Sequence, residues 1–286
     1  MESSSDDDGD AATALPRLLL LCASLFFSCH QPRHEVRHPL LKPLSKPVAA
    51  AKKPKPKAPQ KSRRKKLYFT FDDGPNRGTR NVMDIVRDEG VPVTFFVVGE
   101  HVFASTAQNR VWDSLRIAEH IAVCNHSYSH ANGRYEKYYS NPDSVVSDFR
   151  RTQDSLGLDN PIVRTPGRNI WRVDTLRFTD LKKSAAAADS LQGAGFVVMG
   201  WDLEWEYDHR TLSVSTSADE LARRIDSAFA HGRMKLDGHL IVLAHDQVYQ
   251  HPADSQQLRM LLQLLKKKGD YDFEMMTSYP LVRGSQ

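Results

Sequence analysis

Short apolar segments alternate with longer amphipathic ones from Leu67 onward, and this alternation constrains the fold more than any other feature of the chain. The apolar segments predict strands at Leu67–Phe71, Val93–Val98, His120–Val123, Ile162–Arg164, Phe196–Gly200, Leu240–Ala244 and Phe273–Met275. The amphipathic segments predict helices at Arg80–Glu89, Val111–Ala118, Pro142–Leu156, Ser184–Gln192, Ala218–Ala230 and Ala253–Lys268. This order is typical of βα units with a parallel sheet, either a barrel or an open doubly wound sheet. In both architectures functional side chains collect at the carboxyl ends of the strands.

The first 29 residues have a different character. An apolar run, Leu18–Phe27, follows Arg17. Its length of about ten residues is half of the roughly 20 that span a bilayer, and it suits the apolar region of a secretory signal. The acidic start, Glu2 to Asp10, is unusual for such a signal, and Cys29 would suit lipid attachment. We expect residues 1–29 to be a signal peptide or lipoprotein-like apolar segment. The protein would then be exported and be periplasmic, membrane-anchored or extracellular; lipidation of Cys29 stays open.

Residues 30–66 contain seven prolines, and nine Lys and Arg with no acidic residue lie between Lys52 and Lys66. Such a composition buries too little apolar surface to fold, and we expect a disordered Pro/Lys-rich linker. Residues 1–66 hold 14 of the 39 basic and 6 of the 35 acidic side chains, so residues 67–286 carry a formal charge of −4. A nucleic-acid-binding domain would be basic, so we expect no nucleic-acid partner.

Two pairs of polar residues directly follow predicted strands. Asp72 and Asp73 follow the first strand and precede a Gly-Pro turn, and His126 and His130 follow the third. Alone, each pair has an ordinary explanation, such as a helix cap or a packed histidine. Two histidines four apart on one face of a helical turn suit joint metal ligation, and a carboxylate with two imidazoles leaves positions open, as in catalytic zinc sites. Cys124 is the one cysteine of residues 67–286, which excludes a disulfide and a cysteine-rich zinc site there.

Three further motifs follow later strands. They are Arg164-Thr165-Pro166-Gly167, Trp201-Asp202-Leu203-Glu204-Trp205 and Leu243-Ala244-His245-Asp246. Each motif alone has a structural explanation, but their joint placement at strand ends favours one common site.

Together these motifs resemble those of the NodB-homology polysaccharide deacetylases, carbohydrate esterase family 4. Thr70–Pro75 matches the family's first motif, His126–His130 its His-Ser-x-x-His motif, Arg164–Pro166 its Arg-x-Pro motif and Leu243–His245 its Leu-x-His motif. The resemblance runs from about Leu67 to His245. It implies an α/β fold, a distorted, incomplete (β/α)7-8 barrel, with residues 67–286 as the catalytic domain.

The resemblance also implies roles for individual residues. Asp73, His126 and His130 would bind a divalent metal. Zn²⁺ is the expected ion, and Co²⁺ and Ni²⁺ are the alternatives. Asp72 would be the general base, oriented by Arg164, and His245 the general acid. Trp205, Leu243 and Gly167 would form the acetyl pocket. The family's Asp-Trp pair is matched only loosely here, so either Asp202 or Glu204 would support His245.

The function that follows is metal-dependent removal of acetyl groups from an N-acetylated glycan, such as peptidoglycan or a chitin-like polymer of N-acetylglucosamine. Two alternatives stay open: an O-acetyl esterase acting on a polysaccharide such as xylan, and a non-catalytic carbohydrate-binding relative. The expected partner is a polysaccharide, with a membrane tether through the N-terminal segment. The sequence does not indicate an oligomeric state.

Overall fold

The computed structural model describes residues 64–283, all of which belong to one compact unit, Pro59–Gln286. The expected leader and the linker up to Arg63 lie outside the described residues. The first strand begins at Lys65, two residues before the expected domain boundary, because Lys65 and Lys66 pair with Tyr271 and Asp272 of the last strand. No helix within residues 64–283 combines the length and apolar character that crossing a membrane requires.

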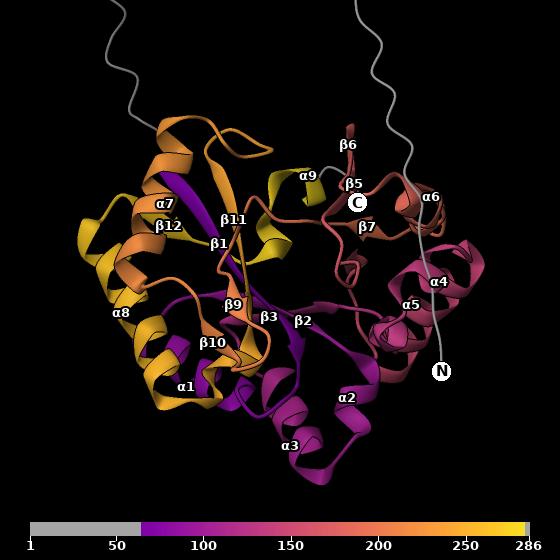
Figure 1. Cartoon of the computed structure of the whole chain (residues 1–286), viewed down its shortest axis with the longest axis horizontal. Coiled ribbons are helices and arrows are strands. Elements are labelled where there is room, and N and C mark those ends of the chain that lie inside the picture. Colours follow the sequence, from indigo (N-terminus) through magenta and orange to yellow (C-terminus); the bar gives the residue numbers. More distant parts are fainter. Residues whose placement is uncertain (1–63, 284–286) are drawn as a thin grey trace, which may run out of the picture. The chain divides into compact units, whose positions relative to one another are not determined.

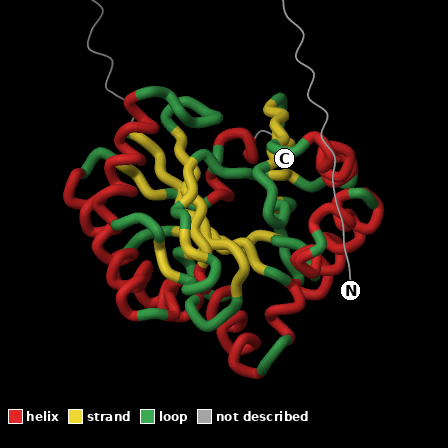
Figure 2. The backbone as a smooth tube through the Cα atoms, viewed as in Figure 1, coloured by secondary structure: helices red, strands yellow, loops and turns green. Residues whose placement is uncertain are grey.

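The strands form a curved sheet surrounded by helices (Figures 1 and 2). Its order is β6-β5-β7-β4-β3-β2-β1-β11-β8, and β12 pairs with the start of β1. The strands are β1 (Lys65–Gly74), β2 (Val93–Val97), β3 (Ile121–Asn125), β4 (Ile162–Val163), β5 (Ile170–Val173), β6 (Leu176–Thr179), β7 (Val197–Val198), β8 (Leu203–Glu204), β11 (His239–His245) and β12 (Tyr271–Phe273). β9 (Tyr207–Asp208) and β10 (Ser213–Val214) form a separate hairpin.

The helices are α1 (Thr79–Glu89), α2 (Gly99–Phe103), α3 (Thr106–Leu115), α4 (Tyr135–Tyr139), α5 (Pro142–Leu156), α6 (Ala185–Gly193), α7 (Ala218–Ala230), α8 (Pro252–Lys268) and α9 (Pro280–Arg283). α1, α7 and α8 lie on one side of the sheet in Figure 1, and α4, α5 and α6 lie on the other. Short 3₁₀ segments occur at His130–Gly133, Lys182–Ser184, Asp246–Gln250 and Met276–Ser278.

The alternation of side chains along β1 separates core from site. Leu67, Phe69 and Phe71 join the apolar cluster under the helices, whereas Tyr68 joins the cluster on the inner face. Because side chains alternate between the faces of a strand, Thr70 and Asp72 share the inner face with Tyr68. The same reasoning applies to β11, where Leu240, Val242 and Ala244 pack outward and His245 points inward.

The expected incomplete barrel is confirmed, but the sheet is not wholly parallel. β5 runs antiparallel to both β6 and β7, and neither β5 nor β6 was predicted. The β5–β6 hairpin turns at Asp174, whose φ of 48° lies in the left-handed region. The sequence there lacks the Asn-Gly or Asp-Gly pair that marks most such turns, which is why the pattern did not reveal the hairpin.

Candidate active site

Asp72 and Asp73 lie at the end of β1, where a bulge separates them. The register between β1 and β2 shifts between Asp72 and Gly74, and Asp73 has a φ of 75°. Two successive strand residues would normally face opposite sides of the sheet. The bulge rotates the backbone, and both carboxylates line the same cavity.

His126 and His130 lie on an irregular loop after β3. The expected helical turn is wrong, because Ser127 and His130 have φ values of 69° and 46°. Local hydrogen bonds hold this backbone: the N–H of Ser127 donates to Asn125 Oδ1, and the N–H of His130 donates to Ser127 Oγ. The loop still brings the two rings together, with centroids 5.1 Å apart.

Asp73, His126 and His130 form a candidate metal site. Asp73 Oδ1 lies 3.1 Å from His130 Nε2 and 3.5 Å from His126 Nε2. Ligand atoms placed tetrahedrally at about 2.0–2.1 Å from zinc are roughly 3.3–3.5 Å apart, so these separations suit one ion. Asp73 Oδ1 is buried and makes no hydrogen bond with the described residues, as expected of an atom reserved for a metal. The three side chains therefore fit a divalent cation.

A hydrogen bond outside this trio fixes the orientation of one ligand. His126 Nδ1 donates to the backbone oxygen of Arg164 over 2.8 Å, which leaves Nε2 as the ligand atom. Burial alone would raise the pKa of Asp73, but the imidazoles of His126 and His130 hold it well below its usual range. Asp73 is therefore ionised at neutral pH, the state that a metal ligand requires.

Arg164, which follows β4, is fully buried and holds Asp72 in place. Its Nη1 donates to Asp72 Oδ1 over 2.8 Å and to Thr70 Oγ1 over 2.7 Å. Nε and Nη2 donate to the backbone oxygens of Met199 and Gly200, just after β7. A buried guanidinium whose donors are occupied on both sides fixes the direction of the Asp72 carboxylate.

His245 ends β11 in direct register with Asp72 on β1. Its ring lies against Tyr207, with centroids 4.9 Å apart, and its Nδ1 is buried with no hydrogen-bond partner in the described part of the chain. Gln247 donates to the hydroxyl oxygen of Tyr207 over 3.1 Å. The β9–β10 hairpin thus supplies the wall against which the His245 imidazole packs.

Asp246, next to His245, connects the two strand ends. It is fully buried and accepts hydrogen bonds from Thr79 Oγ1 and Asn76 Nδ2, beyond the end of β1. A Cβ on Gly78 would lie 1.8 Å from the Asp246 backbone oxygen, so glycine is required for this approach. Burial raises the pKa of Asp246 to about 7. The contact keeps the Asp72–Asp73 segment close to His245.

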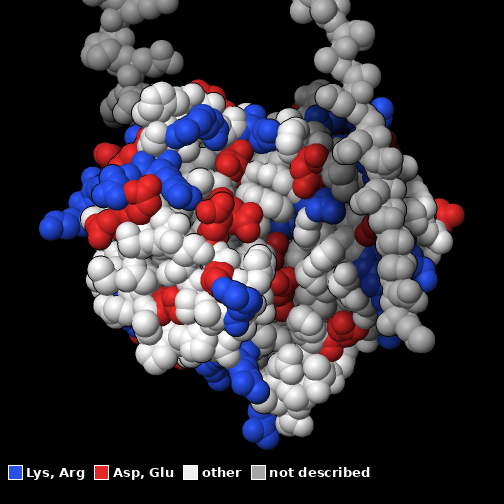
Figure 3. Space-filling model, viewed as in Figure 1, with Lys and Arg blue, Asp and Glu red and all other residues white. Residues whose placement is uncertain are grey.

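A cavity of about 460 Å³ at the carboxyl ends of the strands is lined by Asp72, Asp73, His126, His130 and His245. Figure 3 shows a hollow near the centre of the face that it draws, with acidic side chains along it. Leu243 and Gly167 line the cavity as expected. Trp205 does not: it is 1% exposed, and its indole N–H donates to the backbone oxygen of Thr216 in the outer core. Trp201 lines the cavity in its place.

The two acids considered as supports for His245 lie in different places. Asp202 does not line the cavity; its oxygens accept hydrogen bonds from the backbone N–H groups of Lys235 and Ile241. Burial raises the pKa of Asp202 to about 6. Glu204 does line the cavity, and burial raises its pKa while the nearby His245 lowers it. Neither acid hydrogen-bonds to His245 Nδ1.

Several lining residues escaped the sequence prediction: His101, Tyr135, Trp201, Tyr207, His209 and Gln247. Tyr135 packs over Gly167, where a Cβ would come within 3.0 Å of its ring. The Tyr135 ring reaches this place from α4. In the sequence, Gly167 indicates that another group can approach the backbone closely at this position. It does not identify Tyr135 as that group.

The fold and the site define a hydrolase built on an open βα barrel, with a His/Asp metal-binding group at its strand ends. Residues 59–169 match the polysaccharide deacetylase family. The chain is 38% identical over 195 residues to the chitooligosaccharide deacetylase of Rhizobium leguminosarum bv. phaseoli. The matched region covers 64% of this chain and 69% of that protein. The chain belongs to the polysaccharide deacetylase family.

One other relative agrees with this assignment, and one solved structure shares the fold. The peptidoglycan-N-acetylglucosamine deacetylase of Bacillus cereus is 24% identical over 216 residues, covering 74% of this chain and 69% of that protein. A Streptococcus mutans CE4 esterase of known structure superimposes with a TM-score of 0.55 at 24% identity, covering 74% of this chain and 86% of that one. The chain spans about two thirds of the length of the curated relatives that it matches.

Proposed function

We propose that this protein hydrolyses the acetamide of N-acetylglucosamine units in a peptidoglycan or chitin-like glycan, with zinc as the metal. The observation that carries the proposal is the register of Asp72 with His245 across β1 and β11, beside the Asp73, His126 and His130 group. With a base and an acid at adjacent strand ends, the base can activate the water that attacks a bond and the acid can protonate its leaving group. Relatives named for chitooligosaccharide and peptidoglycan substrates support the choice of an N-acetylated glycan.

The side chains divide the reaction between them. Asp72, oriented by Arg164, accepts the proton of the attacking water. The backbone N–H of Gly167, which lines the cavity, donates to the developing oxyanion. His245 donates a proton to the departing amine. Leu243 and Trp201 surround the acetyl methyl group and limit the access of water.

Asp73, His126 and His130 would hold the metal. A divalent metal in such a site acts as a Lewis acid that polarises the acyl carbonyl and lowers the pKa of water. Two further residues position these ligands. The backbone oxygen of Arg164 accepts a hydrogen bond from His126, and Ser127 Oγ accepts one from the backbone N–H of His130.

We also propose that the N-terminal segment exports the protein and tethers it at the cell envelope. The apolar run Leu18–Phe27 and the Lys/Pro-rich residues that follow it support this location, where such a glycan would be encountered.

The test is acetate release from N-acetylglucosamine oligomers by the zinc-reconstituted chain. We expect release that stops on chelation, resumes when zinc is restored and falls at least a hundredfold in Asp72→Asn. Asp113→Asn, which changes an exposed carboxylate on α3, is the matched control and should retain wild-type activity. Tight zinc binding without release from any oligomer would refute the amide specificity, and acetylated xylan would then test the O-acetyl esterase alternative.

A further inference from the structure

His101, on α2, lies beside the candidate metal group without belonging to it. It lines the active-site cavity and is partly buried. Its Nδ1 lies 2.7 Å from the backbone oxygen of Asp73. Because a carbonyl oxygen can only accept a hydrogen bond, Nδ1 carries the proton and donates it. The other ring nitrogen, Nε2, makes no hydrogen bond with residues 64–283.

This hydrogen bond reaches a metal ligand whose backbone is unusual. Asp73 has a φ of 75°, in the left-handed region that residues other than glycine rarely adopt. Such a conformation persists only where neighbouring contacts hold it. The next carbonyl oxygen, of Gly74, accepts a hydrogen bond from the backbone N–H of Val98 over 2.8 Å. The one after it, of Pro75, accepts a hydrogen bond from Gln108 Nε2 over 2.9 Å. Three successive carbonyl groups are therefore anchored on α2 and the residues that flank it.

The first turn of α2 also holds the loop that carries the two histidine ligands. The backbone N–H of Gly99 donates to the backbone oxygen of Ser127 over 3.0 Å. The next N–H, of Glu100, donates to the backbone oxygen of Tyr128 over the same distance of 3.0 Å. A Cβ on Gly99 would lie 2.6 Å from the Tyr128 ring, so glycine is required for this approach. α2 therefore contacts both of the segments that supply the metal ligands.

We propose that His101 is a positioning residue for the metal group. Its Nδ1–H fixes the backbone of Asp73 relative to α2, and α2 fixes the loop that carries His126 and His130. His101 thereby sets the direction from which the Asp73 carboxylate meets the two imidazoles. Removal of a residue that orients a metal ligand typically lowers metal affinity or activity by about 10- to 100-fold. The proposal rests on the metal group of the proposed function and adds a residue that supports it.

Three substitutions separate the Nδ1 hydrogen bond from the ring itself. His101→Phe keeps a ring and removes the donor. His101→Asn places an amide donor close to the position of Nδ1, whereas His101→Gln places it close to the position of Nε2. We expect zinc affinity to fall about 10- to 100-fold in His101→Phe and His101→Gln, and to change less than about threefold in His101→Asn. The zinc Kd of each full-length variant is measured by competition with a chromophoric chelator.

His231→Phe is the matched control. His231 is exposed after α7, and its Nδ1 also donates to a backbone oxygen, that of Ser227, over 2.8 Å. This variant should bind zinc as the parent protein does. The unfolding temperature of each variant is also measured without zinc. His101→Asn and His101→Gln should agree in this temperature and differ in zinc affinity, a separation that a general structural role of the side chain would not produce.

The outcomes distinguish this proposal from the proposed function. A zinc Kd of His101→Phe equal to that of the parent protein overturns the role of His101. Equal zinc affinities of His101→Asn and His101→Gln also overturn it, because the position of the donor would then not matter. If the parent protein binds no zinc, the metal group and the role of His101 both fail. If it binds zinc but releases no acetate from N-acetylglucosamine oligomers, only the proposed function fails.

Discussion

Arg164 Nη1 lies 2.8 Å from Asp72 Oδ1, and the same guanidinium also contacts the backbone that follows β7. One buried side chain therefore joins three strand ends and directs the Asp72 carboxylate. Its planar set of donors cannot be reproduced by an ammonium group.

Arg164→Lys should lower both activity and stability. Lysine leaves carbonyl oxygens of Met199 and Gly200 without their donors, which should cost about 2–4 kcal/mol of unfolding free energy. The misdirected Asp72 should lower kcat by about a hundredfold or more. Urea unfolding and acetate release measure the two effects.

Arg172→Lys is the matched control. Arg172 is also buried, but its donors go to Asp189 and to the backbone oxygens of Trp171 and Phe178, away from the cavity. The Arg172→Lys variant should have a lower free energy of unfolding and should keep most of its acetate-releasing activity. Equal loss of activity in both variants would mean that Arg164 acts only through stability.

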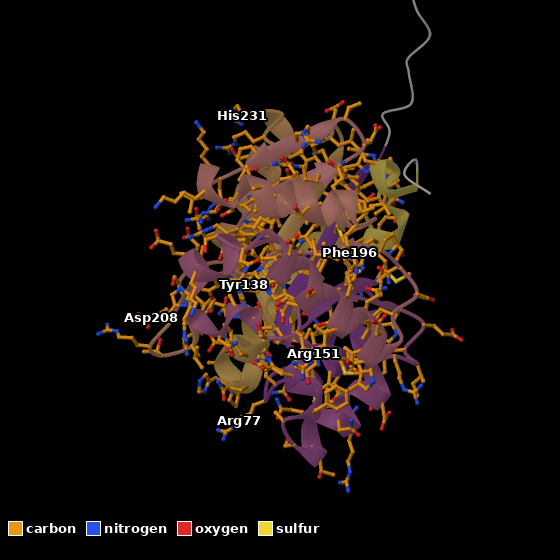
Figure 4. The ribbon with its side chains drawn as sticks, turned by 90° about the vertical axis from the view of Figure 1, so that its right-hand side faces the viewer. Arg77, Tyr138, Arg151, Phe196, Asp208 and His231 are labelled. Atoms are coloured by element: carbon orange, nitrogen blue, oxygen red, sulfur yellow. The ribbon has the colours of Figure 1, made fainter. Side chains whose placement is uncertain are left out.

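His130→Asn should remove one metal ligand without disturbing the core, because His130 is only partly buried. Zinc affinity should fall at least a hundredfold, and zinc should no longer raise the unfolding temperature at concentrations that protect the parent protein. Calorimetric titration and thermal unfolding with and without zinc provide the measurements. His231→Asn, at the upper edge of Figure 4, changes an exposed histidine after α7 and should respond to zinc as the parent does. A zinc-dependent shift of equal size in His130→Asn would exclude His130 as a ligand.

Tyr207 should act through its ring rather than through its hydroxyl. Tyr207→Phe keeps the ring against His245 and loses only the hydrogen bond with Gln247, so kcat/KM should change less than about threefold. Tyr207→Ala frees the imidazole and should lower kcat/KM by about tenfold or more. Arg210→Ala is an exposed control in the same hairpin, which projects from the domain at Asp208 in Figure 4. If the alanine and phenylalanine variants behave alike, the ring does not position His245.

Asp202 should make stability depend on pH. Burial raises its pKa from 3.8 to about 6 in the folded state, so the folded protein holds the proton more tightly than the unfolded chain does. Its contribution is therefore greatest below about pH 4, falls as the pH rises to about 6, and stays constant above that. The stability of the parent relative to Asp202→Asn should fall by about 2 kcal/mol between pH 4 and pH 7, as measured by urea unfolding. A pH-independent difference would contradict the prediction.

Much of this molecule could be predicted from local patterns. Short apolar runs located β1 and β11, helical spacing located α5 and α7 within a residue, and strand-end placement selected Asp72, Asp73, His126, His130, Arg164 and His245. These features depend on nearest neighbours in the chain, so the sequence contains the information directly.

Tertiary contacts decided the rest. A β-bulge, not a simple strand end, directs Asp73 into the cavity, and a left-handed loop, not a helical turn, joins His126 to His130. Trp205 was predicted as a pocket residue because it stands at the Trp of the family's Asp-Trp motif, but core packing takes it outward and leaves Trp201 at the cavity. The sequence by itself determined which side chains follow the strands. Only the tertiary structure decided which of them meet, because the bulge and the packing of the Tyr135 and Tyr207 rings depend on contacts between residues far apart in the chain.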